Sequence, residues 1–529
     1  MTLSDPPREA TRTDRLLAAV GGLLAGYVSL AVADLAAFWV RPEAGPVPAV
    51  GGAVVDRTPA AVKEWAIRTF GESDKAVLQL GILVLLGLLA VGIGLLALRH
   101  RLLGSAAVGA FGLLGALAAV TRPDSDSALD AVPSLVGAVA GAVLLYGLIG
   151  LLFARRSRAG SGGARADRRT FLVVAASAGL AATGAAAVAR AVGSPVEENA
   201  VASRAALRLP RPASPAPAVP AGAQLRVPGI GPFVTPNRDF YRVDTALVVP
   251  RVDAGRWRLR LHGSGVREEL TLTLRDLMAR RTVERDITLA CVSNEVGGPY
   301  VGNARWLGVS LADLLREAGV RPPSEGGPAD QLVARSVDGM TIGTPVEQVM
   351  DGRDALLAFG MNGEPLPFAH GFPVRMVVPG LYGYVSACKW ITSIELTTFA
   401  AYDAYWVPRG WAAQAPVKTQ SRIDTPRSFA RPSAGTVMIA GVAWAQHRGI
   451  RRVEVRVDDG PWQRAELGAE DSIDTWRQWL YPWTATPGRH TLTVRATDGT
   501  GATQPEERTG TMPDGAQGWH SVVVTVEGE

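Results

Sequence analysis

The sequence predicts a helical membrane segment, then a mixed α+β domain, then an all-β domain, and three observations carry this prediction. The 529 residues are 47% hydrophobic and only 19% charged, with a mean hydropathy of +0.14, which is too apolar for a wholly soluble protein. Long apolar runs are confined to residues 1–200. Beyond a proline-rich stretch, short apolar runs alternate with turn residues, first between helices and then in an unbroken series of strands. This length accommodates several domains.

Five apolar runs in the N-terminal part are each near the roughly 20 residues needed to cross a bilayer. They are Leu16–Val40, Ala76–Leu98, Leu102–Val120, Ala131–Phe153 and Thr170–Val192. Asp34 lies inside the first run, close to its end, where an interfacial position suits an ionisable side chain. We therefore expect four transmembrane helices within residues 1–155 and a fifth membrane segment within 156–193.

Arginine clusters predict the orientation of these helices. The clusters are Arg8, Arg12 and Arg15, then Arg99 and Arg101, then six arginines from Arg155 to Arg169. They alternate with acidic or mixed segments, Arg41–Lys75 and Arg122–Asp130, the latter containing Asp124 and Asp126. Positive charge favours the cytoplasmic side. The pattern therefore predicts a multi-pass protein of the cell membrane with a cytoplasmic N-terminus and everything after the fifth run outside.

The fifth run follows Asp167-Arg-Arg-Thr-Phe-Leu172, which resembles a twin-arginine export signal. An ordinary positive flank of a membrane helix explains the same arginines, and both interpretations stay open. The export interpretation matters because that pathway moves folded proteins, as a domain loaded with cofactor in the cytoplasm would require. We expect the run to remain in place as an anchor.

Residues 194–223 are rich in Pro and Ala, most densely in Leu209–Pro220. Such a composition suits neither a helix nor a central strand and predicts a semi-rigid extended spacer.

Residues 224–412 alternate between strand-like runs and short helices, which predicts a mixed α+β domain. The runs are Trp257–Leu261, Ile287–Val292, Leu332–Ser336, Ala355–Met361, Val374–Val378 and Lys389–Leu396. Helix starts are indicated by pairs of capping residues, namely Thr273 with Asp276, Ser310 with Asp313, and Thr344 with Glu347. Gly319 ends the second of these helices, and Asn362-Gly363 marks a tight turn.

Residues 413–529 show an all-β pattern of short strands separated by turn residues. The strands are Val437–Ala445, Val453–Val457, Trp462–Leu467, Trp476–Trp483, His490–Ala496 and Trp519–Val526. Regular short strands at this spacing predict an immunoglobulin-like sandwich. Its tryptophans are expected to anchor the core and interfaces, and they are Trp444, Trp462, Trp476, Trp479, Trp483 and Trp519.

Cys291, one of two cysteines, lies where the apolar run Ile287–Val292 meets a polar loop that ends at Gly298. On local pattern alone, a small buried residue is favoured, because free cysteine is among the most buried residue types. The functional alternative is a thiolate that binds a soft metal. The second cysteine, Cys388, is interpreted as a small buried residue.

Several separated motifs between about Pro236 and Val526 resemble, in the same order, the sulfite oxidase family of molybdopterin enzymes. They are Thr235–Asp244, the Cys291 segment, Ala304–Leu315, Ser336–Gly339, His370–Gly380, Tyr382-Gly383 and Lys389–Ile391. The β domain resembles the dimerisation domain of that family, including its closing Gly518–Ser521 segment. The resemblance therefore implies a possible homodimer.

The resemblance implies one molybdenum, held by the dithiolene of a molybdopterin and by a single thiolate that maps to Cys291. The implied chemistry is two-electron oxo-transfer. The cofactor contacts map to Asp239, Tyr241, Arg242, Ser336, Asp338, His370, Arg375, Ser386, Ala387 and Lys389. Arg375 suits the phosphate of the pterin, because a guanidinium forms forked, charge-assisted hydrogen bonds. The active-site tyrosine of the family maps to residues 401–411, where Tyr405 and Trp411 are the catalytic candidates and Tyr402 and Trp406 compete.

One departure from the family concerns the substrate. Sulfite-oxidising members carry Cys-x-x-Asn-Arg-Arg, and this chain has Glu295 and Val296 in place of the two arginines. A dianion favours a cluster of guanidinium groups. Arg305 and Arg409 are the remaining candidates for positive charge near the metal. The departure argues against sulfite as the substrate.

The sequence thus supports a membrane-anchored molybdenum oxidoreductase acting on a small oxo-donor or oxo-acceptor outside the cytoplasm. Its electron partner would be a quinone or a separate redox protein, and nothing in the composition indicates nucleic acid. The alternative is a non-enzymatic surface or binding protein that keeps the fold without metal. A transporter would require more polar residues in the spans.

Overall fold

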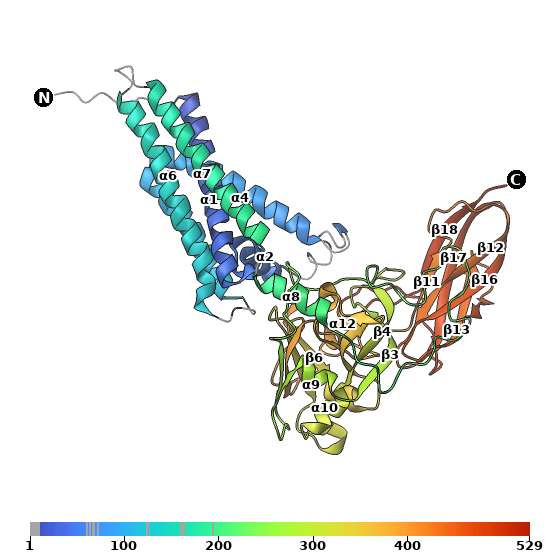
Figure 1. Ribbon diagram of the computed structural model, residues 1–529. Coiled ribbons are helices and arrows are strands. Elements are labelled where there is room, and N and C mark those ends of the chain that lie inside the picture. Colours follow the sequence, from blue (N-terminus) through green and yellow to red (C-terminus); the bar gives the residue numbers. More distant parts are fainter. Residues whose placement is uncertain are drawn as a thin grey trace. The chain divides into compact units, whose positions relative to one another are not determined.

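The computed structural model describes residues 11–59, 62, 65, 69–70, 74–122, 125, 127–158, 164–192 and 195–528. Arg8, Asp124 and Asp126 of the predicted topology lie outside these residues, and so does the side chain of Arg168 in the twin-arginine pair. Contacts divide the chain into two compact units (Figure 1). The first comprises Met1–Glu198 with Thr245–Val249, and the second comprises Asn199–Asp244 with Pro250–Glu529.

The first unit is helical. Its elements are α1 (Arg12–Val40), η1 (Pro42–Ala44), α2 (Pro46–Arg57), α4 (Asp74–Arg99), α5 (Arg101–Val120), η3 (Ala128–Ala131), α6 (Val132–Arg158) and α7 (Ala164–Val192). Among the described residues, four helices are long and apolar enough to cross a membrane, namely Arg12–Val40, Ala76–Arg99, Arg101–Val120 and Ala128–Phe153. They correspond to the first four predicted runs. The described apolar stretch of α7, Arg169–Gly184, is shorter than a span, so the fifth crossing stays a prediction.

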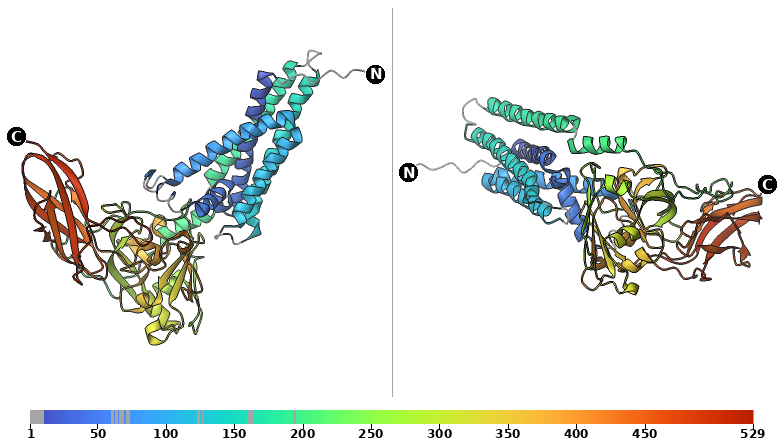
Figure 2. Two further views of the ribbon diagram at one scale, coloured as in Figure 1. Left: turned by 180° about the vertical axis from the view of Figure 1, so that it is seen from behind. Right: turned by 60° about the horizontal axis from the view of Figure 1, so that its bottom comes forward.

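Small residues let helix α1 approach its neighbours closely. Helices α4, α6 and α7 all contact α1, and Figure 2 shows the bundle from two further sides. A Cβ added to Gly22 of α1 would lie 2.1 Å from the Ala90 carbonyl oxygen of α4, and one added to Gly94 would lie 2.1 Å from that of Ala18. Such close backbone contact is how membrane helices gain packing energy, because lipid offers no hydrophobic drive between helices.

The predicted spacer, residues 194–223, is extended only in the second part of its described residues. Its first part forms helix α8 (Pro195–Ala206), whose Arg204 donates hydrogen bonds to the carbonyl oxygens of Pro365 and Leu366 at 2.7 and 2.8 Å. Proline at the start and the Glu- and Ala-rich sequence favour this helix. The second part is extended, but Ser214 exchanges backbone hydrogen bonds with the strand containing Val283. Proline tolerates such edge pairing. This stretch is therefore part of the second compact unit, which is called the head below.

Two sheets follow in the second unit, one mixed and one antiparallel. One has the order β2-β1-β10-β5-β6, in which only β1 and β10 pair in parallel. The other has the order β3-β4-β7-β8, and β9 also pairs with β7. The strands are β1 (Arg258–Gly263), β2 (Leu270–Thr273), β3 (Thr282–Ala290), β4 (Val301–Ser310), β5 (Gln331–Ser336), β6 (Thr341–Pro345), β7 (Leu356–Met361), β8 (Glu364–Pro365), β9 (Arg375–Val377) and β10 (Ile391–Thr397). Every strand predicted in this domain is present, while β2, β4, β6 and β8 were not predicted.

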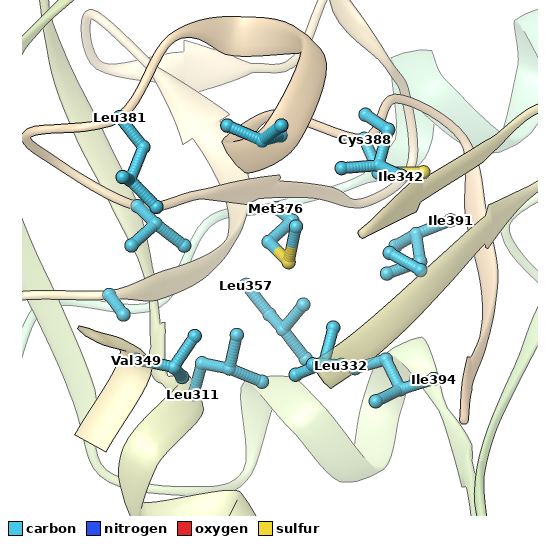
Figure 3. Close-up of a cluster of buried hydrophobic side chains, with 14 of the residues drawn as sticks. Leu311, Leu332, Ile342, Val349, Leu357, Met376, Leu381, Cys388, Ile391 and Ile394 are labelled. Carbon is cyan, nitrogen blue, oxygen red and sulfur yellow. The ribbon is translucent and has the colours of Figure 1, made fainter. Parts of the chain in front are cut away.

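An apolar core joins the two sheets. Leu357 and Met376 come from one sheet and Leu332 and Ile394 from the other, and their side chains converge in Figure 3. Cys388 belongs to the same cluster and is fully buried, which confirms its interpretation as a small core residue.

Short helices α9 (Leu274–Met278), α10 (Leu311–Glu317), α11 (Val346–Met350) and α12 (Gly383–Ser386) connect these strands. Thr273 and Asp276 form the predicted capping box, and Ser310 accepts a hydrogen bond from the Asp313 backbone. Thr344 is not a cap: Pro345 occupies that position, and the Thr344 hydroxyl instead donates to the Val385 carbonyl oxygen. The buried Thr344 hydroxyl is therefore satisfied across the fold rather than locally.

The C-terminal region is β-rich, as predicted. Its sheets have the orders β11-β12-β16-β15 and β14-β13-β17-β18. The strands are β11 (Gln420–Thr425), β12 (Gly435–Trp444), β13 (Ile450–Val457), β14 (Gln463–Arg464), β15 (Glu466–Leu467), β16 (Arg477–Ala485), β17 (Gly488–Asp498) and β18 (His520–Val526). One apolar cluster combines residues of both sheets, such as Ile439 and Trp479 with Val453 and Val524. The immunoglobulin-like identity of this region stays a prediction.

The six tryptophans of this region fall into two groups. Trp444, Trp476, Trp479 and Trp483 are buried, as expected of core anchors. Trp462 and Trp519 are half-buried and pack edge to face with ring centroids 4.8 Å apart.

Candidate functional site

Cys291 lies directly after β3, at the base of a closed loop. Its backbone N–H donates to the Tyr300 carbonyl oxygen at 2.9 Å, and its carbonyl oxygen accepts from the Asn294 N–H at 3.1 Å. The Asn294 side chain closes the loop by accepting from the Tyr300 N–H at 2.8 Å. These bonds fix the backbone that carries the thiol.

The Cys291 thiol is buried, with 8% of the residue exposed. Burial raises the pKa of this thiol. Hydrogen bonds from the backbone and side chain of Ser293 oppose that effect, as does the positive charge of Lys389. The thiol therefore lies among groups that stabilise a negatively charged sulfur, which is the form that binds metals.

Tyr241 and helix α12 lie beside the end of β3. A Cβ added to Gly383 would lie 3.6 Å from the Ala290 carbonyl oxygen and 3.8 Å from the Tyr241 hydroxyl. Burial, and secondarily the charge of Cys291, raises the pKa of Tyr241. Its phenol is therefore neutral and can donate a hydrogen bond.

Arg375 begins β9 and is buried, with 5% of the residue exposed. Its Nη1 donates to the His370 carbonyl oxygen at 3.2 Å, and its guanidinium lies over the Trp306 ring, 4.9 Å from the centroid. Its Nε is buried and has no hydrogen-bond partner among the residues that the structure describes. Burial lowers the pKa of Arg375 to about 10. An unsatisfied buried donor of this kind is costly unless a ligand accepts its proton.

His370 ends a short helical turn, η5 (Phe368–His370), and its Nε2 lies 3.0 Å from the Asn237 carbonyl oxygen. Because a carbonyl oxygen only accepts, Nε2 carries the proton and Nδ1 is an acceptor in the neutral ring. Burial, followed by the charges of Arg375 and Lys389, lowers the pKa of His370 to about 4. The imidazole is therefore neutral near pH 7.

Lys389 and Arg242 share one buried carboxylate, that of Asp244. Lys389 Nζ lies 2.5 Å from Asp244 Oδ2, and Arg242 Nε lies 2.9 Å from the same oxygen. The Asp244 side chain is only 1% exposed. Asp244 lies inside the first quoted motif but is not among the predicted cofactor residues. A carboxylate between an Arg and a Lys of one predicted site is the signal that could have identified it.

The other predicted cofactor residues have more local contacts. Asp239 is exposed and pairs with Arg238 at 3.4 Å. Ser336 and Asp338 accept hydrogen bonds from backbone N–H groups of the turn between β5 and β6. Ser386 donates to the carbonyl oxygens of the Leu381–Tyr382 segment, and Ala387 caps α12. The structure thus brings Tyr241, Arg242, His370, Arg375 and Lys389 together around the Cys291 strand. The other five residues have contacts in a turn, in helix α12 or at the surface.

Tyr405 and Trp411 belong to an aromatic cluster with Trp406 and Tyr384. Trp411 is buried, and its ring centroid is 5.6 Å from that of Tyr384. Within the described part of the chain, its Nε1 has no hydrogen-bond partner. Because Tyr384 follows Gly383 in α12, this cluster continues from the helix beside Cys291. Both catalytic candidates are therefore in one cluster, connected to the site through α12.

The two arginines expected to supply positive charge near the metal have other contacts. Arg305 pairs with Asp286 of the adjacent strand at 2.6 Å, and the Arg409 guanidinium lies 3.7 Å from the centroid of the Tyr405 ring. Arg305 therefore fixes β4 against β3. Within the described ranges, no cluster of three or more His, Cys, Asp or Glu side chains is placed to hold a metal ion.

The C-terminal region contributes contacts to the Cys291 loop that the sequence analysis missed. The His520 ring lies against Gly297, and Arg422 Nη1 donates to the Gly298 carbonyl oxygen at 2.9 Å. His520 lies in the quoted Gly518–Ser521 segment, but a local motif does not indicate which distant loop it meets.

Comparison with known proteins places the chain among molybdenum enzymes. Residues 246–406 match the family model of the oxidoreductase molybdopterin binding domain. Mitochondrial sulfite oxidase of Mus musculus is 33% identical over 288 residues, which cover 47% of this chain and 52% of the relative. The chain thus spans about half the length of that sulfite oxidase.

Two further similarities concern a bacterial protein and a solved structure. The uncharacterized oxidoreductase YuiH of Bacillus subtilis is 31% identical over 159 residues, covering 30% of this chain and 74% of the relative. The crystal structure of the sulfane dehydrogenase SoxCD from Paracoccus pantotrophus matches 56% of this chain and 83% of its own, with 25% identity and a TM-score of 0.47. The interpretation as a non-enzymatic surface protein is set aside by the family similarities. The chain has a molybdopterin binding domain, and it belongs to the sulfite oxidase family of oxidoreductases.

Proposed function

We propose that the chain is a membrane-anchored oxidoreductase in which Cys291 supplies the protein thiolate to a single molybdenum. The observation that carries this proposal is the position of Cys291, at the end of β3 and beside Tyr241 and Lys389. When bound, the cofactor supplies two-electron oxo-transfer between a small substrate and an electron partner. That partner is a quinone or a separate redox protein.

The residues of the site fit a phosphate-bearing cofactor. The buried Nε of Arg375 has no partner in the described ranges, and a guanidinium is well suited to phosphate oxygens. Arg375, Lys389 and Arg242 together make the surroundings of His370 electropositive. A phosphate would satisfy the orphaned donor and offset the buried positive charge.

The chain's own groups have distinct roles in this proposal. Cys291 is held by the closed loop, so that its sulfur has a fixed position. Tyr241 stays neutral and donates a hydrogen bond, while neutral His370 offers Nδ1 as an acceptor to the polar pterin. The Asp244 carboxylate holds Lys389 and Arg242 in place. Trp411, whose Nε1 has no partner among the described residues, is the candidate donor to a substrate oxygen.

The substrate is proposed to be other than sulfite. Glu295 is exposed in the loop after Cys291, where a carboxylate repels a dianion. Arg305 forms an ion pair with Asp286. It therefore does not replace the two arginines that sulfite-oxidising members carry in place of Glu295 and Val296. A neutral oxide, such as a sulfoxide or an N-oxide, would bind without this repulsion.

We further propose that the N-terminus is cytoplasmic, that α7 is the fifth crossing and that the head faces outward. The support is the placement of arginines at alternate helix ends, including Arg12 and Arg15 of α1 and Arg99 and Arg101 between α4 and α5. The head also supplies a possible dimer contact through its C-terminal β region.

The ligand assignment is tested by X-ray absorption at the molybdenum edge, on the purified holoprotein. Cys291→Ser should show one sulfur neighbour fewer than the wild type, and turnover should fall by about a hundredfold or more. Cys388→Ala is the matched control, because that cysteine lies in the apolar core; its sulfur shell should be unchanged. An identical sulfur shell in Cys291→Ser would refute the assignment. A screen of sulfoxides, N-oxides and sulfite with dye partners tests the substrate, and fastest turnover with sulfite would contradict that part.

A further inference from the structure

We propose that His520, together with Arg422, is a positioning residue of the molybdenum site. Both come from the C-terminal β region, and both hold the loop that follows Cys291 in the conformation that presents the thiolate. The proposal rests on Cys291 being the metal ligand.

Gly297 makes the closest of these contacts. Its φ of +80° is a left-handed conformation that favours glycine. A Cβ added there would lie 2.2 Å from His520 Cδ2 and 2.3 Å from its Nε2. The edge of the imidazole is therefore in direct contact with the loop backbone, and only a residue without a side chain allows this approach.

The His520 ring is itself held in place. Its Nδ1 accepts a hydrogen bond from the Ile423 backbone N–H at 3.0 Å. Burial, and then the charges of Arg508 and Arg422, lowers the pKa of His520 to about 4, so the ring is neutral and Nδ1 is free to accept. The ring thus bridges β11 and the Cys291 loop, with one edge on each.

Arg422 holds the next residue of the loop. Its Nη1 donates to the Gly298 carbonyl oxygen at 2.9 Å, while its Nε pairs with Asp424 at 2.6 Å. The two sides of the loop are therefore fixed differently: Asn294 closes it from within, and β11 and β18 support it from outside.

The strand that leads into the loop is fastened to the same region. The Thr288 hydroxyl accepts from the Trp476 N–H at 2.7 Å, and the Thr288 carbonyl oxygen accepts from Gln446 Nε2 at 2.9 Å. The Thr288 N–H donates to the Asp474 carbonyl oxygen at 2.9 Å. Strand and loop are thus attached together, which gives the C-terminal region a part in the geometry of the metal site.

A shift of about 1 Å in a reacting group can cost about a hundredfold in rate. Losing the His520 contact should therefore affect the chemical step more than substrate binding. The experiment compares His520→Ala with His490→Ala in full-length holoenzyme. His490 is a matched control, because it lies in β17 of the same region and its ring contacts Asp458 and Thr486.

We expect His520→Ala to keep its molybdenum and its KM, while kcat falls by about tenfold to a hundredfold. Amide hydrogen exchange should quicken in the peptide spanning residues 292–300. His520→Asn should recover part of kcat, because its Oδ1 can accept from the Ile423 N–H in place of Nδ1. His490→Ala should match the wild type in all of these measurements. Unchanged kcat and unchanged exchange in His520→Ala would overturn the proposal.

A second pair of variants tests the contact from the loop side, in case His520→Ala unsettles the whole region. Gly297→Ala places a Cβ against the His520 ring and should lower kcat. Gly363→Ala imposes the same backbone strain, since Gly363 has a φ of +83°, but nothing lies within 4 Å of its Cβ. Equal effects on kcat in the two variants would overturn the proposal.

Failure of the ligand assignment would have a different signature. In that case Cys291→Ser would keep its sulfur shell at the molybdenum edge, while the exchange contrast between His520→Ala and His490→Ala would persist. Failure of the positioning proposal would abolish that contrast and leave the Cys291→Ser result intact.

Discussion

Cys291 and Cys388 are the two cysteines of the chain, and both thiols are buried in the same compact unit. Cys388 is surrounded by Ile342, Ile391 and Met376 of the apolar core, as Figure 3 shows, and burial raises the pKa of its thiol. Cys291 is also buried, and the positive charge of Lys389 acts on both thiols. Hydrogen bonds from Ser293 stabilise a negative charge on Cys291 in addition. Burial and positive charge are therefore common to both, and the hydrogen-bond donors around the sulfur distinguish a ligand candidate from a packing residue.

The largest predicted loss of stability follows from replacing Asp244, which pairs with the Lys389 near Cys291. Asp244→Asn leaves Lys389 and Arg242 without their buried carboxylate, and breaking such a pair costs about 4 kcal/mol. Urea unfolding of the full chain, followed by tryptophan fluorescence, measures this loss.

Asp239→Asn is the matched control for this prediction. Its carboxylate is 56% exposed and pairs with an exposed arginine, so its loss should change stability by less than about 0.5 kcal/mol. Similar losses of stability in Asp244→Asn and Asp239→Asn would contradict the prediction that the buried carboxylate contributes more stability than the exposed one.

Local patterns in the sequence predicted helix caps and turns well where a few neighbouring residues determine the backbone conformation. Thr273 with Asp276 formed its capping box, and Asn362-Gly363 formed its turn with positive φ at both residues. Strand β4 was missed because its glycines and asparagine suggest a loop. Pairing on both sides, with β3 and with β7, overrides that weak propensity.

The motifs selected several residues that the structure brings together, but they carried no information on contacts between distant segments. The resemblance selected Arg375 and Lys389, and the structure brings both near Cys291. It also selected Asp239, which faces solvent, because a motif does not specify the direction of each side chain. The contacts of His520 with Gly297 join segments far apart in the chain, and no local pattern carries that information.

The second predicted effect is a loss of stability at acid pH, which depends on the neutral imidazole of His370. Its pKa is about 4 in the folded protein and about 6.5 when unfolded, through burial and the charges of Arg375, Lys389 and Arg242. The unfolded chain therefore gains a proton first as the pH falls. The stability contributed by neutral His370 is complete above pH 6.5 and declines by roughly 3 kcal/mol down to pH 4.

Urea titrations of the cofactor-free protein between pH 7 and pH 4 measure this decline. His370→Asn should show a shallower loss than the wild type over the same range, because asparagine does not titrate. His520 has the same direction of pKa shift, so part of the wild-type loss should persist in His370→Asn. Parallel curves for the two proteins would contradict the prediction.

The smallest predicted loss of stability concerns Cys388, in the apolar core. Cys388→Ser places a hydroxyl among Ile342, Ile391 and Met376, which should cost about 2 kcal/mol, because a buried polar group loses its hydrogen bonds to water. The Lys389 carbonyl oxygen, which accepts from the thiol at 3.7 Å, can offset part of this cost. Urea unfolding gives the loss of stability, and the molybdenum content should equal that of the wild type. Loss of the metal in Cys388→Ser, with Cys291 intact, would indicate that Cys388 also binds the metal. It would contradict the distinction between the two cysteines.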